Sequence, residues 1–126
     1  MARSLDRLLT YAEGQMLEER QLALLNTEME EGSAAEVQRE FREGLAGAKA
    51  RVRAFRPGDY DAVRGIGRRQ LPTTVAGLLI HCAEHTARHL GQAVTTAKLL
   101  AQLQRSESRT EPDALSGTVD QAHSAV

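Results

Sequence analysis

Apolar residues recur along the first third of the chain at the three- and four-residue spacing of an α-helix. The first series comprises Leu5, Leu8, Leu9, Ala12 and Met16. A second, less regular series runs from Leu22 to Met29. The pattern leaves open whether residues 2–30 form one helix or two, but Gly14 weakens a helix and favours a break over residues 14–17.

A longer helix is predicted to begin after Gly32. Ser33 and Glu36 form a capping box, in which each side chain can accept a hydrogen bond from a free amide at the helix start. One apolar stripe then follows, made of Val37, Phe41, Leu45, Ala48, Val52 and Phe55. The helix should end at Arg56-Pro57-Gly58, and residues 57–72, rich in glycine and proline, are expected to form a connecting loop.

The last helix is predicted to begin behind a cap at Thr73 or Thr74 and to run to about Gln104. The chain then turns polar without an apolar period, so residues 106–126 are expected to be a disordered tail, with His123 outside any site. Residues 1–105 would form a single domain. The expected fold is all-α, an antiparallel bundle of three to four helices.

Composition narrows this picture only a little. The 126 residues allow one domain, and an aromatic content of 3% means a core of Leu, Val and Ala, which suits helix-on-helix packing. The net charge of -1 gives no reason to expect nucleic acid or an anionic membrane as a partner. No signal peptide or membrane-spanning run is visible. The single cysteine, Cys82, fits a reducing cytoplasm.

Candidate chemistry is concentrated in the last predicted helix, where His81, His85 and His89 stand four residues apart. Residues at this spacing are neighbours on a helix, so an adjacent pair can bind one metal ion. At about 100° per residue, His89 lies inside the apolar sector, His85 on its border and His81 beside it. A metal site and a polar core network remain equally open. All three are not expected on one ion, because His81 and His89 lie about 12 Å apart along a straight helix.

Three nearby motifs carry less weight. The string His81-x-x-Glu84-His85 matches that of inverted zinc proteases, but the further acidic ligand of that class would have to come from the polar tail. Residues 64–69 combine two glycines with three arginines, and a flexible basic turn is favoured over an anion site. Cys82 faces the apolar sector, so we expect a buried, inert thiol.

The string His85-Thr86-Ala87-Arg88-His89-Leu90-Gly91-Gln92, preceded by residues 71–79, resembles the DinB-like superfamily, whose members often carry H-x-x-x-H-x-G-Q in their last long helix. Residues 4–9 are similar to the helix that follows the first ligand in that family. The resemblance implies a four-helix bundle that binds a divalent metal, commonly zinc or nickel, through three histidines. It assigns two of them to His85 and His89, and it implies thiol-dependent transferase or related chemistry.

The chain departs from the family pattern because no histidine occurs before His81. The resemblance places the missing ligand just upstream of Met1, in a helix that this sequence does not contain. The expectation is either a reading frame started too late or the loss of part of the site. Without that helix the bundle would expose an apolar groove, which favours either a homodimer or an unstable protein.

The resulting hypothesis is a divalent-metal-dependent enzyme, of thiol-dependent transferase or hydrolase type, acting on a small-molecule substrate such as a low-molecular-weight thiol. His85 and His89 would bind the metal weakly, and His81 would serve as acid, base or substitute ligand. Gln92 would donate a hydrogen bond near the same face. The alternative is a non-catalytic helical dimerisation module, or a truncated member with an incomplete metal site, so enzyme activity itself stays open.

Overall fold

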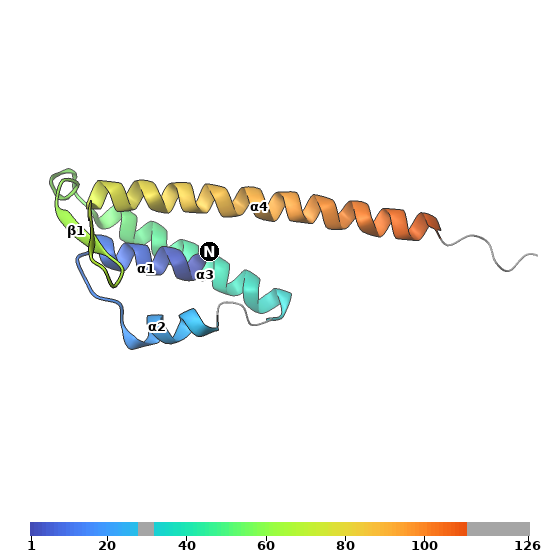
Figure 1. Ribbon diagram of the computed structural model, residues 1–126, viewed down its shortest axis with the longest axis horizontal. Coiled ribbons are helices and arrows are strands. Elements are labelled where there is room, and N and C mark those ends of the chain that lie inside the picture. The colour runs from blue at the N-terminus through green and yellow to red at the C-terminus, as the bar shows by residue number, and fades with distance from the viewer. Residues whose placement is uncertain (28–31, 111–126) are drawn as a thin grey trace, which may run out of the picture. The chain divides into compact units, whose positions relative to one another are not determined.

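The computed structural model describes residues 1–27 and 32–110. This part of the chain is mostly helical, with four α-helices and one two-stranded sheet (Figure 1). Contacts divide the chain within its last helix into two compact units, residues 1–90 and 91–126, and each is described here by itself.

The first two helices are separate, as the weak point at Gly14 indicated. Helix α1 spans Ala2–Ala12 and helix α2 spans Glu19–Asn26. Gly14 lies between them with a φ of 79°, a left-handed conformation that glycine adopts at little cost. The predicted break is therefore confirmed, and its cause is the turn that follows α1.

Helix α3 spans Ala34–Ala54 and begins with the predicted capping box. The Ser33 hydroxyl accepts a hydrogen bond from the Glu36 amide at 3.3 Å, and the Glu36 carboxylate accepts one from the Ser33 amide at 3.0 Å. The helix ends before Phe55, whose backbone is extended, and Pro57 follows two residues later. Local signals thus fix both ends of α3.

The segment after α3 differs from the prediction of a loop over residues 57–72. It contains a short 3-10 helix, Pro57–Asp59, and an antiparallel hairpin of β1 (Val63–Ile66) and β2 (Leu71–Thr74). The turn between the strands is possible because Gly67 and Gln70 adopt positive φ angles of 71° and 47°. The expectation of a purely all-α fold is therefore wrong at this point.

Helix α4 spans Val75–Thr110 and starts directly from the hairpin. The Thr74 hydroxyl accepts a hydrogen bond from the Gly77 amide at 3.1 Å, which confirms one of the two predicted caps. The amides of Val75 and Ala76 donate to the carbonyls of Ala62 and Tyr60, each at 3.0 Å. The first turn of α4 is thus held by the segment that leads into the hairpin.

At its other end α4 continues past the predicted end at Gln104, so residues 106–110 are helical where a disordered tail was expected. The hydroxyls of Ser106 and Ser108 donate to the carbonyls of Leu103 and Gln104 at 2.7 and 2.9 Å, which lets polar residues join the helix. The rest of the predicted tail, with His123, lies outside the described residues. The domain boundary at residue 105 stays a prediction.

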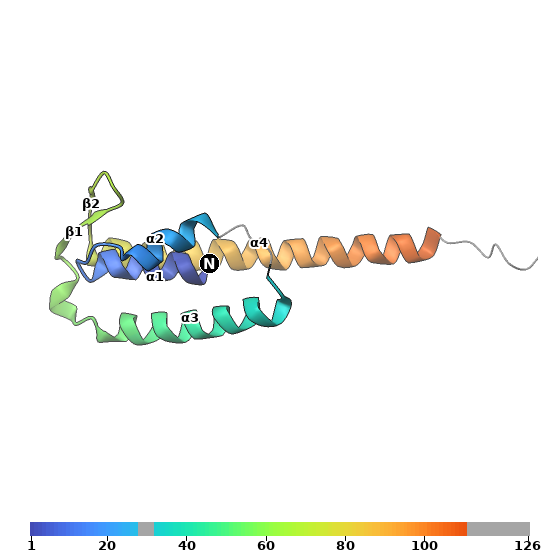
Figure 2. The same cartoon turned by 90° about the horizontal axis from the view of Figure 1, so that it is seen from below.

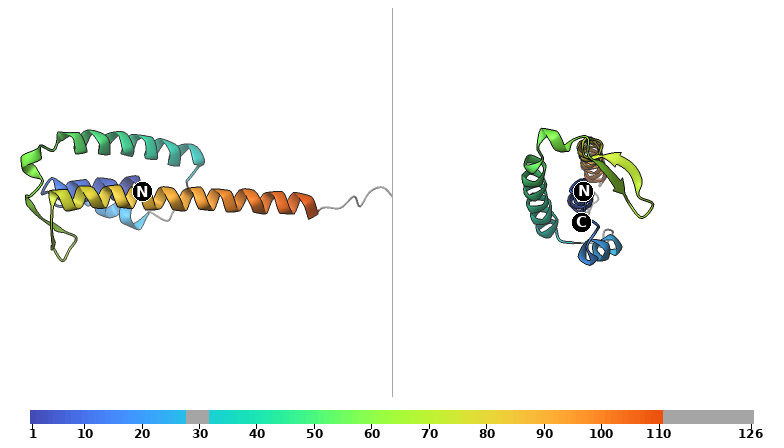
Figure 3. Two further views of the ribbon diagram at one scale, coloured as in Figure 1. Left: turned by 90° about the horizontal axis from the view of Figure 1, so that it is seen from above. Right: turned by 90° about the vertical axis from the view of Figure 1, so that its left-hand side faces the viewer.

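The core lies in the first unit and is built around α1 (Figures 2 and 3). Its buried members, from α1, α3 and α4, are Leu5, Leu8, Leu9, Ala12, Ala48, Leu78 and Cys82. Partly buried Tyr11, Phe55, Ile66 and Leu79 pack against them. The buried position of Cys82 agrees with the expectation of a core thiol, and the leucine-rich composition agrees with helix-on-helix packing.

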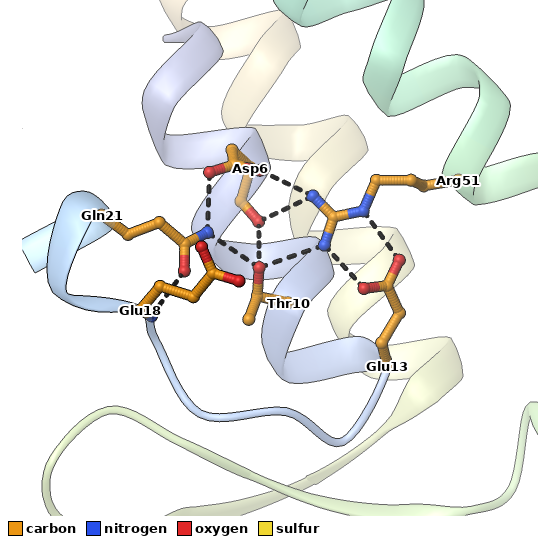
Figure 4. A network of polar contacts seen from close by, with 6 residues as sticks. All are labelled: Asp6, Thr10, Glu13, Glu18, Gln21 and Arg51. Atoms are coloured by element: carbon orange, nitrogen blue, oxygen red, sulfur yellow. Dashed lines mark hydrogen bonds and ion pairs between the residues drawn. The ribbon is translucent and has the colours of Figure 1, made fainter.

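A polar cluster joins α1, α2 and α3 at the edge of this core (Figure 4). The Arg51 guanidinium binds the carboxylates of Asp6 and Glu13, each at 2.7 Å, and donates to the Thr10 hydroxyl at 3.0 Å. The buried Gln21 amide donates to Asp6 at 2.7 Å and to Thr10 at 2.9 Å. These contacts, rather than apolar packing, attach α2 to α1.

The described part of the second unit is the continuation of α4 from Gly91. The side chains of residues 91–109 are exposed apart from the partly buried Ala101. Within residues 1–27 and 32–110, none of the helices combines the length and the apolar character that a membrane span requires.

Candidate metal-binding site

The three histidines of α4 lie on consecutive turns and all belong to the first unit. The ring centroids of His81 and His85 are 6.0 Å apart, and those of His85 and His89 are 4.4 Å apart with the rings meeting edge to face. Helical spacing alone accounts for this arrangement. The pair that the sequence singled out, His85 and His89, is also the closer pair.

His85 carries the most unusual atom of the site. Its ring is only partly buried, but its Nε2 atom is enclosed and has no hydrogen-bond partner among the described residues. An enclosed polar atom left without a partner costs about 1–3 kcal/mol, so a water molecule, an ion or a ligand is expected to meet it. A lone pair on this nitrogen is a suitable donor for a metal ion.

The surroundings of His85 favour its neutral form. Burial lowers the pKa of His85, and charges on His89, His81, the amino terminus of Met1 and Arg88 lower it further. Only the neutral imidazole has a lone pair free for a metal, because protons and metal ions compete for the same nitrogen. The electrostatics of the site therefore agree with the role that the sequence suggested for His85.

The other two histidines differ in exposure. His81 is exposed on the first of the three turns, whereas His89 is partly buried on the last. Gln92, on the next turn of the motif, is exposed and belongs to the second unit. The structure thus brings together two partly buried imidazoles and leaves the third accessible to solvent.

A complete ligand set does not form within the described ranges 1–27 and 32–110. No group of three or more His, Cys, Asp or Glu side chains there could hold one metal ion. Cys82 lies three residues before His85 and is buried. Burial raises the pKa of its thiol, which keeps the thiol protonated and makes it a poor metal ligand. His85 and His89 could supply two donors to a metal centre, and the third donor expected from another helix is not found among the described residues.

The remaining motifs have structural explanations. Glu84 is exposed and joins no metal-binding group among the residues described. Arg64 donates from Nε to the Ala12 carbonyl at 2.8 Å, which ties the hairpin to the end of α1. The basic turn with Arg68 and Arg69 lies in the hairpin before α4, whereas His85 lies about 15 Å along the helix from Val75. The turn is therefore a poor candidate for holding a substrate at the histidines.

Comparison with known proteins gives a family match. No curated protein and no solved structure is similar enough to count as a relative. A sequence profile described as "DinB superfamily" matches residues 1–93, which include α1, α2, α3, the hairpin and the histidine-bearing turns of α4. A match over this much of the chain shows that the protein belongs to the DinB superfamily.

Proposed function

We propose that this DinB superfamily protein binds a divalent metal ion, zinc or nickel, through His85 and His89. The observation that carries the proposal is the enclosed Nε2 atom of His85, which has no partner among the described residues. The His89 ring, at a centroid distance of 4.4 Å, provides the second imidazole. Both side chains come from one rigid helix, which reduces the entropy lost when they bind one ion.

Two protein ligands alone make a weak centre, so we expect low affinity. A third donor could come from His81 after a change of side-chain rotamer, from a second copy of the chain or from the substrate itself. When bound, the metal would act as a Lewis acid and lower the pKa of a coordinated thiol or water. Such chemistry would suit a metal-dependent transferase or hydrolase that uses a low-molecular-weight thiol, and this is the activity that we propose.

His81 is suited to moving protons in such a reaction. Its ring is exposed and lies 6.0 Å from that of His85, so it can reach both solvent and a ligand held by the pair. Histidine changes charge near neutral pH and is the commonest acid or base in enzymes. We assign it the role of catalytic acid or base, or of substitute ligand. We also propose a cytoplasmic location and a DinB-like antiparallel bundle.

Metal analysis tests this proposal directly. The protein is purified without chelator, and zinc and nickel are then measured by mass spectrometry and by titration calorimetry. We expect bound metal in the wild type, loss of it in His85→Ala and His89→Ala, and most of it retained in His81→Ala. The proposal fails if the wild type binds no metal at millimolar concentration. It also fails if a variant that combines His85→Ala and His89→Ala binds metal as well as the wild type.

The second candidate function is a non-catalytic helical dimerisation module. It is favoured by the incomplete ligand set among the described residues and by exposed apolar side chains of α4 such as Ile80 and Leu90. The two functions separate in one pair of measurements. A protein that sediments as a dimer and binds no metal would be such a module, whereas metal binding that depends on His85 and His89 supports the first proposal.

A further inference from the structure

One face of α3 is apolar but uncovered. Val37, Phe41, Leu45 and Val52 are 57%, 36%, 43% and 41% exposed and fall within about 40° of Phe41 on the helix circumference. We call these four residues the α3 stripe. Such a row of apolar side chains at helical spacing normally packs against another element, so its exposure requires an explanation.

The edge of α3 that meets α1 borders the α3 stripe, and the buried Ala48, about 20° from Phe41, marks where the two meet. Gly44 lies so close to α1 that an added Cβ would stand 2.6 Å from that of Ala2. Arg51 and Glu40 form ion pairs with α1 side chains along the same edge. These three residues lie about 60–100° from Phe41 on one side. The four residues of the α3 stripe therefore stay exposed beside the residues through which α3 packs on α1.

The other edge of the α3 stripe is basic. Arg42, Lys49 and Arg53 lie about 80–120° from Phe41 and are exposed. None of the three forms a hydrogen bond or ion pair with another side chain in residues 1–27 and 32–110. A row of free cations therefore runs parallel to a row of exposed apolar side chains.

We propose that the α3 stripe and this basic edge form a docking surface for an acidic amphipathic helix of a partner protein. Apolar side chains of the partner at i, i+3, i+4 and i+7 would cover Phe41 and Leu45. Glutamates along one edge of that helix would face Arg42, Lys49 and Arg53. The apolar row supplies affinity, and the three cations select a partner helix of negative charge and determine its orientation.

Charge also argues against the α3 stripe of a second copy as the occupant. Two α3 helices packed antiparallel through their stripes would place Arg42, Lys49 and Arg53 against the same three residues of the other copy. Like charges in such positions oppose pairing. A polyanion without apolar side chains would satisfy the cations but leave Phe41 and Leu45 exposed to water.

Designed peptides test the docking surface without knowledge of the natural partner. The probe is a fluorescent helical peptide of about 18 residues, roughly five turns, with leucines on one face and glutamates beside them. One control carries lysine in place of each glutamate, and another is polyglutamate without leucines. We expect anisotropy to show binding of the acidic amphipathic peptide only. Equal binding of polyglutamate, or no binding of the probe, would overturn the proposal.

Variants of the protein locate the bound peptide. Phe41→Ala, Arg42→Glu and Lys49→Glu should each weaken binding about tenfold. Arg39→Glu is the matched control, because Arg39 lies on the same helix about 160° from Phe41 and should have no effect. Circular dichroism checks that each variant is folded. If Arg39→Glu weakens binding as much as Arg42→Glu, the surface assignment is wrong.

Sedimentation velocity without peptide provides a separate test. We expect that the α3 stripe takes no part in self-association. A dimer that dissociates in the Leu45→Ser variant would show that a second copy covers the stripe, and it would refute an acidic partner helix. Neither result affects the metal proposal, which depends on a different helix.

Discussion

At the scale of single residues, the candidate site depends on one nitrogen atom. Helical spacing identified His85 and His89 as the pair of interest, and the distance between their rings agrees with that prediction. The sequence could not show that the Nε2 atom of His85 is enclosed without a partner, because enclosure depends on contacts from other elements. Periodicity thus predicts which residues share a face, but not the environment of an individual atom.

The lowered pKa of His85 predicts how the stability of the metal-free protein depends on pH. In the unfolded chain histidine titrates near pH 6.5, whereas burial, helped by nearby positive charges, holds the pKa of His85 lower in the folded state. Below about pH 6.5 the unfolded chain therefore binds more protons, so stability should fall as the pH drops towards the folded-state pKa. Urea unfolding between about pH 7.5 and 5, with chelator present, measures this loss.

His85→Gln, which has no charge at any pH, provides the comparison. The free energy of unfolding of this variant should fall less steeply over the same pH range than that of the wild type. Equal slopes in the two proteins would show that His85 does not titrate differently in the folded and unfolded states.

Arg51 marks a second limit of sequence reasoning at this scale. It binds Asp6 and Glu13, which lie 45 and 38 positions earlier in the chain. No local motif reveals such a pairing, because it arises only when α3 packs beside α1. In the same way, the basic edge of α3 stands in the sequence as scattered arginines and lysines. Whether these cations are available to a partner depends on which edge of α3 already contacts α1.

At the scale of elements, local signals predicted the helices better than their connections. The break at Gly14, the capping box of Ser33 and the cap at Thr74 were all visible in the sequence and are present. The hairpin was missed because its strands are four residues each, too short for an alternating pattern to stand out among glycines and prolines. Its turn also requires a positive φ at Gln70, which composition does not indicate.

Two glycines inside α3 predict opposite effects of the same substitution. A Cβ added at Gly47 would meet nothing within 4 Å, so Gly47→Ala should stabilise the protein by about 0.5–1 kcal/mol through helix propensity. A Cβ at Gly44 would stand 2.6 Å from that of Ala2, so Gly44→Ala should push α1 away from α3 and destabilise the protein. Urea unfolding of the two variants compares them. Two changes of the same sign would contradict the packing described for Gly44.

At the scale of the whole molecule, the family was the part best predicted from sequence. The histidine motif and its helical setting indicated the DinB superfamily, and the profile match over residues 1–93 confirms it. The third metal ligand expected from that resemblance stays a prediction, because no group of three suitable side chains forms among the described residues. Membership of a family indicates an architecture, but it does not show which residues complete a metal site.

The small core predicts high sensitivity to truncation of its central side chain. Leu9 of α1 is fully buried, and it belongs to the small apolar cluster that α1 forms with α3 and α4. Leu9→Ala should cost about 2–5 kcal/mol, a large share of the 5–15 kcal/mol typical of a domain. Leu22→Ala, at a position 43% exposed in α2, is the matched control and should change stability by less than about 0.5 kcal/mol. Thermal unfolding followed by circular dichroism measures both, and similar losses would show that α1 is not the centre of the core.

The hydrogen bonds between the start of α4 and the segment before the hairpin also determine the direction in which the histidines point. Because a helix turns about 100° per residue, the residue at which α4 begins sets the rotational phase of everything after it. Tyr60 and Ala62 fix that residue through the amides of Ala76 and Val75. A residue added within the hairpin turn would leave the phase unchanged, whereas one added between Gly77 and His85 would rotate the histidine pair by about 100°. The segment just before the hairpin therefore sets the rotational phase of the candidate metal site.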